Sequence, residues 1–274
     1  MPGKHKGYAD NSLVVSVEEA SKLLRNKNVI FIDTRNYWKY VKGHIPGAFN
    51  FELYAFHWVD TSKKGIDAFV KQMQMLLRSY GIDKQKQVIF YQNNSGYDAA
   101  RGVWLLNFLG QTNAKLLDGG LNLWKRSKLP VSKKDPSPAK ESNFVAKPNH
   151  ALIASLDSLS SGVRKGSLQV IDTRNSGEYS GKYHRAMRVG HIPDSVNVEW
   201  ECALRKDGTL KNASQLKKLY AGTSKSRETV TYCQSGYRAA HSWLVLKLLG
   251  YKNVRNYLGS WYEWGNNTET QVVL

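Results

Sequence analysis

The sequence predicts an α/β protein made of two tandem copies of one domain, each a mostly parallel sheet flanked by helices. Two observations support this fold class. The chain repeats its own motifs at long range, and within each copy short β-prone runs alternate with longer runs of helical spacing. A length of 274 residues suffices for two ordinary domains, and 41% hydrophobic with 23% charged residues is typical of a globular chain.

A long-range repeat divides the chain into two copies. Residues 29–50 read VIFIDTRNYWKYVKGHIPGAFN, and residues 170–197 read VIDTRNSGEYSGKYHRAMRVGHIPDSVN. Each passes from an apolar run through Asp-Thr-Arg-Asn to Gly-His-Ile-Pro, with eight extra residues between these motifs in the second copy. From Ser95 onward the spacing between copies is constant at 140 residues, so that Ser95 matches Ser235. A period of this length indicates domain duplication rather than a solenoid.

Within each copy, short strands alternate with helices. Buried parallel strands are predicted at residues 29–32, 88–91, 169–171 and 229–232. The second strand of each copy is followed by an apolar run of helical spacing that ends at Gly110 or Gly250, because glycine is typical of a helix C-cap. We therefore predict a first domain over residues 1–130, a surface linker over 131–150 and a second domain over 151–274.

Composition narrows the class of protein. No apolar run approaches the ~20 residues that cross a bilayer, and the basic N-terminus lacks the apolar core of a signal peptide, so a cytoplasmic location is expected. The two cysteines, Cys202 and Cys233, form neither a disulfide framework nor a metal finger. The net charge of +18 is spread along the chain without a nucleic-acid-binding signature. We expect it to attract small anions rather than nucleic acid, the plain alternative being a solvated basic surface.

The stretch TYCQSGYRAA places Cys233 where a predicted strand turns into a predicted helix. Sites in parallel α/β sheets lie just beyond the carboxyl ends of the strands. The free N–H groups and the dipole at a helix start favour negative charge, and Arg238 adds a positive charge. Gly236 permits a tight turn. This corner is therefore expected to hold a thiolate, or an anion bonded to its sulfur.

The length of the loop separates two cysteine chemistries. A phosphatase loop that wraps a tetrahedral phosphate places five residues between its cysteine and its arginine. Here four residues separate Cys233 from Arg238, namely Gln234, Ser235, Gly236 and Tyr237. The smaller ring favours a sulfur atom carried on the cysteine over a phosphate.

Taken together, these motifs make the chain resemble the tandem-domain sulfurtransferases of the rhodanese family, from about Ser16 to the C-terminus. The resemblance rests on Asp-x-Arg with Gly-His-Ile-Pro in each copy, on the Cys-x-x-Gly-x-Arg loop and on YLGSWYEW near the C-terminus. It implies two rhodanese-like domains, a Cys233 nucleophile that carries a persulfide, and substrate contacts from residues 234–238. It also implies a small anionic sulfur donor, a thiophilic acceptor such as cyanide or a thiol, a monomer, and no metal or organic cofactor.

The resemblance further implies that the first domain has lost its chemistry. Asn93 is predicted in the place of Cys233, and Asp98 in the place of Arg238. An amide does not accept sulfur, and a carboxylate repels an anion. Residues 1–130 are therefore expected to form an inactive domain that serves as a scaffold and an interface.

The loop leaves the sulfur donor open. CQSGYR resembles neither the Cys-Arg-Lys-Gly-Val-Thr of thiosulfate-type enzymes nor the Cys-Gly-Ser-Gly-Val-Thr of mercaptopyruvate-type enzymes. The cation and the basic chain favour thiosulfate, while 3-mercaptopyruvate and a role as a persulfide carrier to a partner protein are the alternatives. Glu178 stands where the family's substrate-binding arginine is expected. Arg185 or Arg188 in the inserted segment can substitute for it, or both can be surface charges.

Two features recur in both copies, including the copy without a cysteine. Asp172 and Arg174 recur as Asp33 and Arg35, which predicts a structural ion pair that braces the loop. The histidine of Gly-His-Ile-Pro also recurs, and we interpret it as a turn-forming residue rather than a base.

Overall fold

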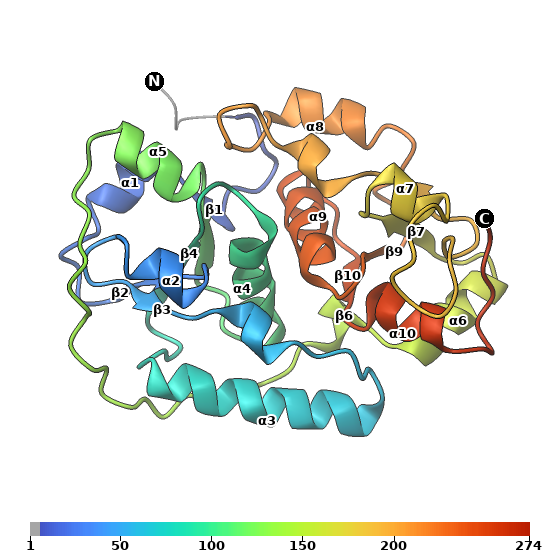
Figure 1. Ribbon diagram of the computed structural model, residues 1–274, viewed down its shortest axis with the longest axis horizontal. Helices are drawn as coiled ribbons and strands as arrows, with labels where there is room; N and C mark the ends of the chain where they lie inside the picture. The colour runs from blue at the N-terminus through green and yellow to red at the C-terminus, as the bar shows by residue number, and fades with distance from the viewer. Residues whose placement is uncertain (1–5) are drawn as a thin grey trace.

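The computed structural model describes residues 6–274 and shows two domains of the same architecture side by side (Figure 1). Each domain contains a five-stranded sheet in which every strand pairing is parallel. The predicted α/β class with two tandem domains is therefore confirmed. No helix within residues 6–274 is long and apolar enough to cross a membrane.

The first sheet has the strand order β1-β5-β4-β2-β3. Its strands are β1 (Val14–Val15), β2 (Val29–Asp33), β3 (Phe49–Asn50), β4 (Gln87–Tyr91) and β5 (Ala114–Leu117). The helices of this domain, with one 3₁₀ turn, are α1 (Val17–Ser21), α2 (Tyr37–Tyr40), η1 (Leu53–Phe56), α3 (Lys63–Ser79), α4 (Tyr97–Phe108) and α5 (Gly120–Arg126).

The second sheet repeats this order as β6-β10-β9-β7-β8. Its strands are β6 (Ile153–Ala154), β7 (Gln169–Asp172), β8 (Val196–Asn197), β9 (Thr229–Tyr232) and β10 (Val254–Tyr257). The helical elements are η2 (His150–Leu152), α6 (Leu156–Arg164), α7 (Ser176–Tyr179), η3 (Trp200–Ala203), α8 (Ala213–Leu219), α9 (Tyr237–Leu248) and α10 (Ser260–Asn266).

The predicted central strands agree with β2, β4, β7 and β9 to within one residue at each end. In β2 and β7 the difference is an aspartate, Asp33 or Asp172, that continues the strand by one residue. Each aspartate stays in register with the neighbouring strand, opposite Tyr91 or Tyr232. An acidic residue is unusual in a buried strand, but a buried arginine two residues later pairs with each of these carboxylates.

The hydrophobic core is continuous across the two domains. Helices α4 and α9 pack against each other between the two sheets (Figure 1). Their apolar side chains belong to one buried cluster that includes Trp104 and Trp243. One further hydrophobic cluster covers the outer face of the first sheet, and another covers that of the second. Both faces of each parallel sheet are thus covered, as parallel sheets require, and one covered face of each is the domain interface.

Two extended segments tie the domains together. Residues 133–149 contain no helix or strand and run along the first domain, where Phe144 is buried (Figure 1). The N-terminal segment crosses instead to the second domain. The N–H of Ala9 donates to the carbonyl of Leu248 at 2.9 Å, and the Tyr8 hydroxyl donates to the carbonyl of Lys211 at 2.6 Å.

His241 is a buried titratable group at the centre of the interface. It lies on α9 with no exposed surface, and its Nε2 is 2.9 Å from the carbonyl oxygen of Ser95 in the first domain. Burial lowers the pKa of His241 to about 4, even though the contact with the Ser95 carbonyl acts in the opposite direction. His241 is therefore neutral in the folded protein at neutral pH.

We predict that His241 makes the fold sensitive to acid. The unfolded chain takes up a proton near pH 6.5, whereas the folded chain does so only near pH 4. The free energy of unfolding therefore falls as the pH drops from 6.5 toward 4, by up to about 3 kcal/mol from this group alone. Denaturant unfolding of the wild type and of His241→Asn at several pH values measures this contribution. Parallel pH profiles for the two proteins would contradict it.

Candidate active site

Cys233 follows β9 directly and lies at the carboxyl edge of the second sheet. Its side chain is buried, and its Sγ accepts hydrogen bonds from the N–H groups of Ser235 at 3.4 Å and Gly236 at 3.1 Å. Gly236 has a φ of +79°, and a Cβ at this position would lie 2.8 Å from the carbonyl oxygen of Leu258. A glycine is therefore required for the backbone to turn its N–H groups toward the sulfur.

The first residues of α10 bind the backbone of Cys233 through hydrogen bonds. Ser260 Oγ accepts the N–H of Cys233 at 3.1 Å and donates to the carbonyl of Tyr257 at 2.7 Å. The N–H of Trp261 donates to the carbonyl of Cys233 at 2.9 Å. Ser260 adopts a left-handed φ of +52°, an uncommon conformation for a residue other than glycine. The motif YLGSWYEW carried this signal, but the sequence did not single out Ser260 as a site residue.

Arg238 is paired rather than free. Its two terminal nitrogens donate to the Glu178 carboxylate at 2.6 and 2.9 Å, and the Glu178 side chain is 1% exposed. Burial alone would raise the pKa of Glu178, but the hydrogen bonds and charge of Arg238 hold it below its usual value. Burial likewise disfavours the charged form of Arg238, yet its hydrogen bonds to Glu178 raise its pKa. The expected loop cation is thus neutralised by a carboxylate.

The other two predicted arginines lie in different surroundings. Arg185 is largely exposed, with its Nε 3.7 Å from Glu178, and its carbonyl accepts the Gln234 side-chain amide at 2.8 Å. Arg188 instead donates to the carbonyl of Trp264 in α10 at 2.9 Å and to that of Thr270 after α10 at 2.6 Å, which fastens the inserted segment to the C-terminal part of the chain. Contact between Arg188 and a substrate stays a prediction, and these hydrogen bonds favour a structural role.

Asp172 and Arg174 form the expected ion pair beneath the loop. Arg174 donates to both Asp172 oxygens and, at 2.7 Å, to the carbonyl of Gly190 in the Gly-His-Ile-Pro turn. Its guanidinium also lies 4.5 Å from the centre of the Trp261 ring. Asp33 and Arg35 repeat this geometry in the first domain. In both domains the pair links a central strand to the same turn.

The corresponding corner of the first domain corrects one prediction. The N–H of Leu121 donates to the carbonyl of Gln92 at 2.8 Å, as the N–H of Trp261 does to that of Cys233. Gln92, not Asn93, therefore occupies the place of the cysteine. The sequence comparison missed this because the first loop is one residue longer between the strand and Ser95, which shifts the alignment.

The side chain of Gln92 folds over the start of α4. Its Oε1 accepts the N–H of Asp98 at 3.1 Å, and its Nε2 donates to Asn94 at 3.0 Å. Burial, with the nearby Glu52 carboxylate, raises the pKa of Asp98 to about 7. This corner thus presents an amide and an acidic group, with no thiol and no cation in the matching positions.

Tyr237, the first residue of α9, brings the first domain to the site. Its hydroxyl donates to the carbonyl of Leu53 at 2.8 Å. Its ring packs against Tyr54 and His57 of the first domain, with ring centres 5.4 and 6.1 Å apart. Burial raises the pKa of Tyr237 to about 12, so its hydroxyl remains protonated. The cysteine loop is therefore closed on one side by the other domain.

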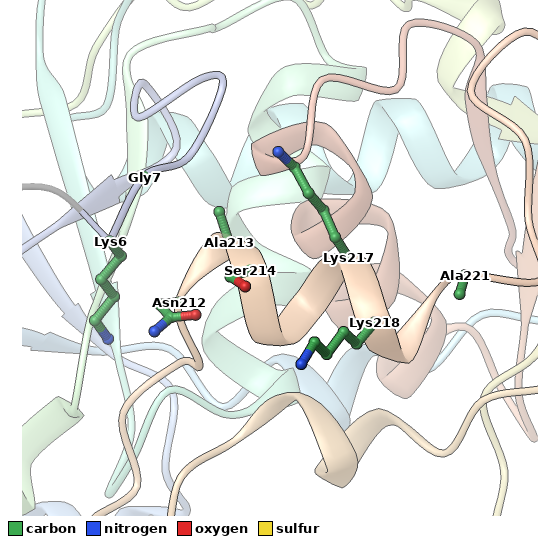
Figure 2. Close-up of a pocket in the computed structure, with 8 residues that line it drawn as sticks. All are labelled: Lys6, Gly7, Asn212, Ala213, Ser214, Lys217, Lys218 and Ala221. Atoms are coloured by element: carbon green, nitrogen blue, oxygen red, sulfur yellow. The ribbon is translucent and has the colours of Figure 1, made fainter.

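A cavity of about 670 Å³ lies elsewhere, between the N-terminal segment and α8 (Figure 2). Lys6, Lys217 and Lys218 line it, but their ammonium groups point in different directions (Figure 2). None of the predicted site residues lines this cavity. Within residues 6–274, no group of three or more His, Cys, Asp or Glu residues is placed to hold a metal ion.

The buried pair predicts a stability effect for Glu178→Gln. The change leaves the Arg238 charge without a carboxylate, so we expect the free energy of unfolding at pH 7 to fall by about 2–4 kcal/mol. Because pairing lowers the pKa of Glu178, the difference from wild type should shrink as the pH falls below about 4. Chemical denaturation measures both effects. Glu18→Gln in the exposed pair with Lys22 is the control, with an expected change below about 0.5 kcal/mol; equal effects for the two variants would show that burial of the pair does not matter.

Comparison with known proteins agrees with this architecture. The family model described as "Rhodanese-like domain" matches residues 16–127 and 155–267. A protein of Mycolicibacterium smegmatis, named "Putative thiosulfate sulfurtransferase", is 33% identical over 97% of this chain and 99% of its own. The sulfur carrier protein TtuD of Thermus thermophilus is 32% identical over 95% of this chain and 96% of its own.

A solved structure shows the same similarity. The 3-mercaptopyruvate sulfurtransferase SseA from Escherichia coli superposes with a TM-score of 0.78 and 26% identity, covering 92% of this chain and all of SseA. Each family match contains four of the five strands of one sheet, and the cysteine loop lies in the second match. The chain therefore belongs to the rhodanese family of sulfurtransferases, as a protein with two tandem rhodanese-like domains.

Proposed function

We propose that this protein is a thiosulfate sulfurtransferase in which Cys233 carries the transferred sulfur. The observation that carries the proposal is the sulfur cradle: a buried Sγ that accepts two backbone N–H groups at the start of α9. Such donors stabilise negative charge without having to reorganise during the reaction. The same donors suit both a thiolate and the terminal sulfur of a persulfide.

The proposed reaction is a double displacement. The Cys233 thiolate attacks the outer sulfur of thiosulfate, a bond forms between the two sulfurs, and the sulfur–sulfur bond of thiosulfate breaks to release sulfite. One negative charge stays on the terminal sulfur of the persulfide, and two leave with sulfite. Cyanide or a thiolate then attacks this sulfur and restores the thiolate. The two half-reactions predict ping-pong kinetics.

Charge supports a dianionic donor in an indirect way. The net charge of +18 raises the concentration of anions around the molecule, and Arg185 adds an exposed cation beside the loop. Arg238 contributes less than its position in the sequence indicates, because Glu178 neutralises it. The name of the Mycolicibacterium relative points to the same donor.

The first domain has a different part in this proposal. Its corner holds the Gln92 amide in place of a thiol, and Asp98 in place of Arg238. We therefore propose that residues 1–130 carry no sulfur. Their contribution is to close the Cys233 loop through contacts to Tyr237.

Two alternatives share the Cys233 persulfide. The similarity to SseA favours 3-mercaptopyruvate as the donor, and the similarity to TtuD favours a carrier that passes sulfur to a partner protein. The ratio of kcat/KM for thiosulfate and 3-mercaptopyruvate separates the first alternative. A stable persulfide with slow turnover on either donor would favour the carrier.

We predict that Cys233→Ser abolishes thiocyanate formation from thiosulfate and cyanide, because a serine hydroxyl does not form a persulfide. Intact mass after thiosulfate treatment should rise by about 32 Da, one sulfur atom, in the wild type but not in this variant. Cys202→Ser is the matched control, since Cys202 is the other, exposed thiol. Full activity in Cys233→Ser, or loss of the adduct in Cys202→Ser, would overturn the proposal.

We predict that thiosulfate turnover weakens with salt. Rising ionic strength screens the attraction between the basic surface and a dianion, so kcat/KM for thiosulfate should fall between low salt and about 0.5 M salt, while kcat changes little. Steady-state kinetics with sodium chloride measures this split. A salt-independent kcat/KM would show that the net charge plays no part in donor capture.

A further inference from the structure

Arg101 of α4 is a buried cation for which residues 6–274 provide no hydrogen-bonding partner at Nη1. The residue is 2% exposed. No carboxylate of the described chain forms an ion pair with it. Its guanidinium lies instead over aromatic rings, 4.2 Å from the ring centre of Trp104, 5.3 Å from that of Tyr237 and 5.7 Å from that of Phe69.

Burying such a charge is energetically unfavourable, because the guanidinium loses its hydration. Cation–π contacts recover part of the lost hydration, but an unpaired guanidinium in an apolar interface still destabilises the fold. Burial lowers the pKa of Arg101 to about 10, which leaves the group protonated at neutral pH. The interface therefore contains a permanent positive charge that packing alone does not explain.

Arg101 lies next to the cysteine loop. Arg101 comes from the domain without a thiol, and it lies on the ring of Tyr237, which directly follows the cradle residue Gly236. Electrostatic interactions with Tyr237 and then with a Cys233 thiolate favour the charged form of Arg101. Burial lowers the pKa of His57 beside the same tyrosine, and the charge of Arg101 lowers it further. Arg101 thus acts on the groups that surround the sulfur.

The repeat supplies an internal comparison. With the spacing of 140 residues, the position of Arg101 on α4 corresponds to His241 on α9. His241 faces the first-domain corner, bonds to Ser95 and is neutral. The two helices thus cross the interface in the same way, but the corner that contains the cysteine faces a cation and the corner that contains Gln92 faces a neutral ring.

We propose that Arg101 is a positioning residue for Cys233, through which the first domain lends the site an unpaired positive charge. This charge favours anions at the Cys233 sulfur, whether the thiolate, the persulfide or an incoming donor. Arg238 supplies less of it, because the Glu178 carboxylate offsets its charge. The inference rests on the proposed function only in placing the reacting sulfur at Cys233.

The test measures the charge at Cys233 without a sulfur donor. Iodoacetate and iodoacetamide both alkylate a thiolate, but only iodoacetate is an anion. The rate constant for iodoacetate divided by that for iodoacetamide therefore reports the electrostatic potential at the sulfur. Changes in the thiolate fraction cancel in this ratio. A Cys202→Ser background restricts alkylation to Cys233. For Arg101→Met we expect this ratio to fall about three- to ten-fold, and for Arg101→Lys to stay within about two-fold of the parent.

Stability separates this role from a structural one. Arg101→Met removes an unpaired buried charge and keeps an unbranched apolar stem, so its unfolding midpoint should equal or exceed that of the parent. Arg101→His places the residue of the matching α9 position on α4 and gives a second neutral variant. Arg25→Met, an exposed position on the first domain, is the control and should change neither the ratio nor the midpoint.

The outcomes are distinct. A reduced ratio in both neutral variants, restored by lysine, supports the proposal, and kcat/KM for thiosulfate should then fall about ten-fold, less than the roughly hundred-fold that loss of a direct oxyanion donor produces. An unchanged ratio in the neutral variants overturns it. A ratio that falls equally in Arg101→Lys and Arg101→Met also overturns it, because the charge would then be irrelevant. If the ratio responds but thiosulfate is not a donor, the proposed function fails and this inference stands.

Discussion

The buried ion pair of Asp172 and Arg174 is the interaction on which the active corner depends. Arg174 connects the end of β7 to the carbonyl of Gly190 and lies over the ring of Trp261. The backbone N–H of Trp261 in turn donates to the Cys233 carbonyl. Loss of Arg174 would leave a buried charge unpaired and release the sheet edge, the turn and the loop together. Since the first domain keeps the same pair without a thiol, its purpose is architectural, and the chemistry is added to it.

The sequence predicts the fold well because its signals are local. Apolar runs locate the central strands, glycines mark the ends of α4 and α9, and the repeat shows that the two halves share one design. The one-residue strand extensions at Asp33 and Asp172 escape prediction because an acidic residue indicates a strand end unless its buried partner is known.

The site is predicted less completely, because its missing parts come from distant positions. Cys233 and its loop are visible from composition and spacing. The pairing of Arg238 with Glu178, the support from Ser260 and the approach of Arg101 join residues that lie far apart in the chain or on opposite sides of the domain interface, which no local pattern encodes. The shift from Asn93 to Gln92 has a simpler cause, a one-residue insertion that sequence spacing hides and hydrogen bonds reveal.

The crossing of the N-terminal segment has a consequence for synthesis. Domains generally fold in order as they leave the ribosome, the N-terminal one first. Here Ala9 donates a hydrogen bond to the carbonyl of Leu248, and Tyr8 donates one to that of Lys211. The ribosome synthesises both acceptor residues long after residues 8 and 9. The first sheet can assemble early, but its leading segment reaches its place only after the second domain has emerged. The nascent first domain therefore keeps this segment without its hydrogen-bonding partners until the second domain is complete.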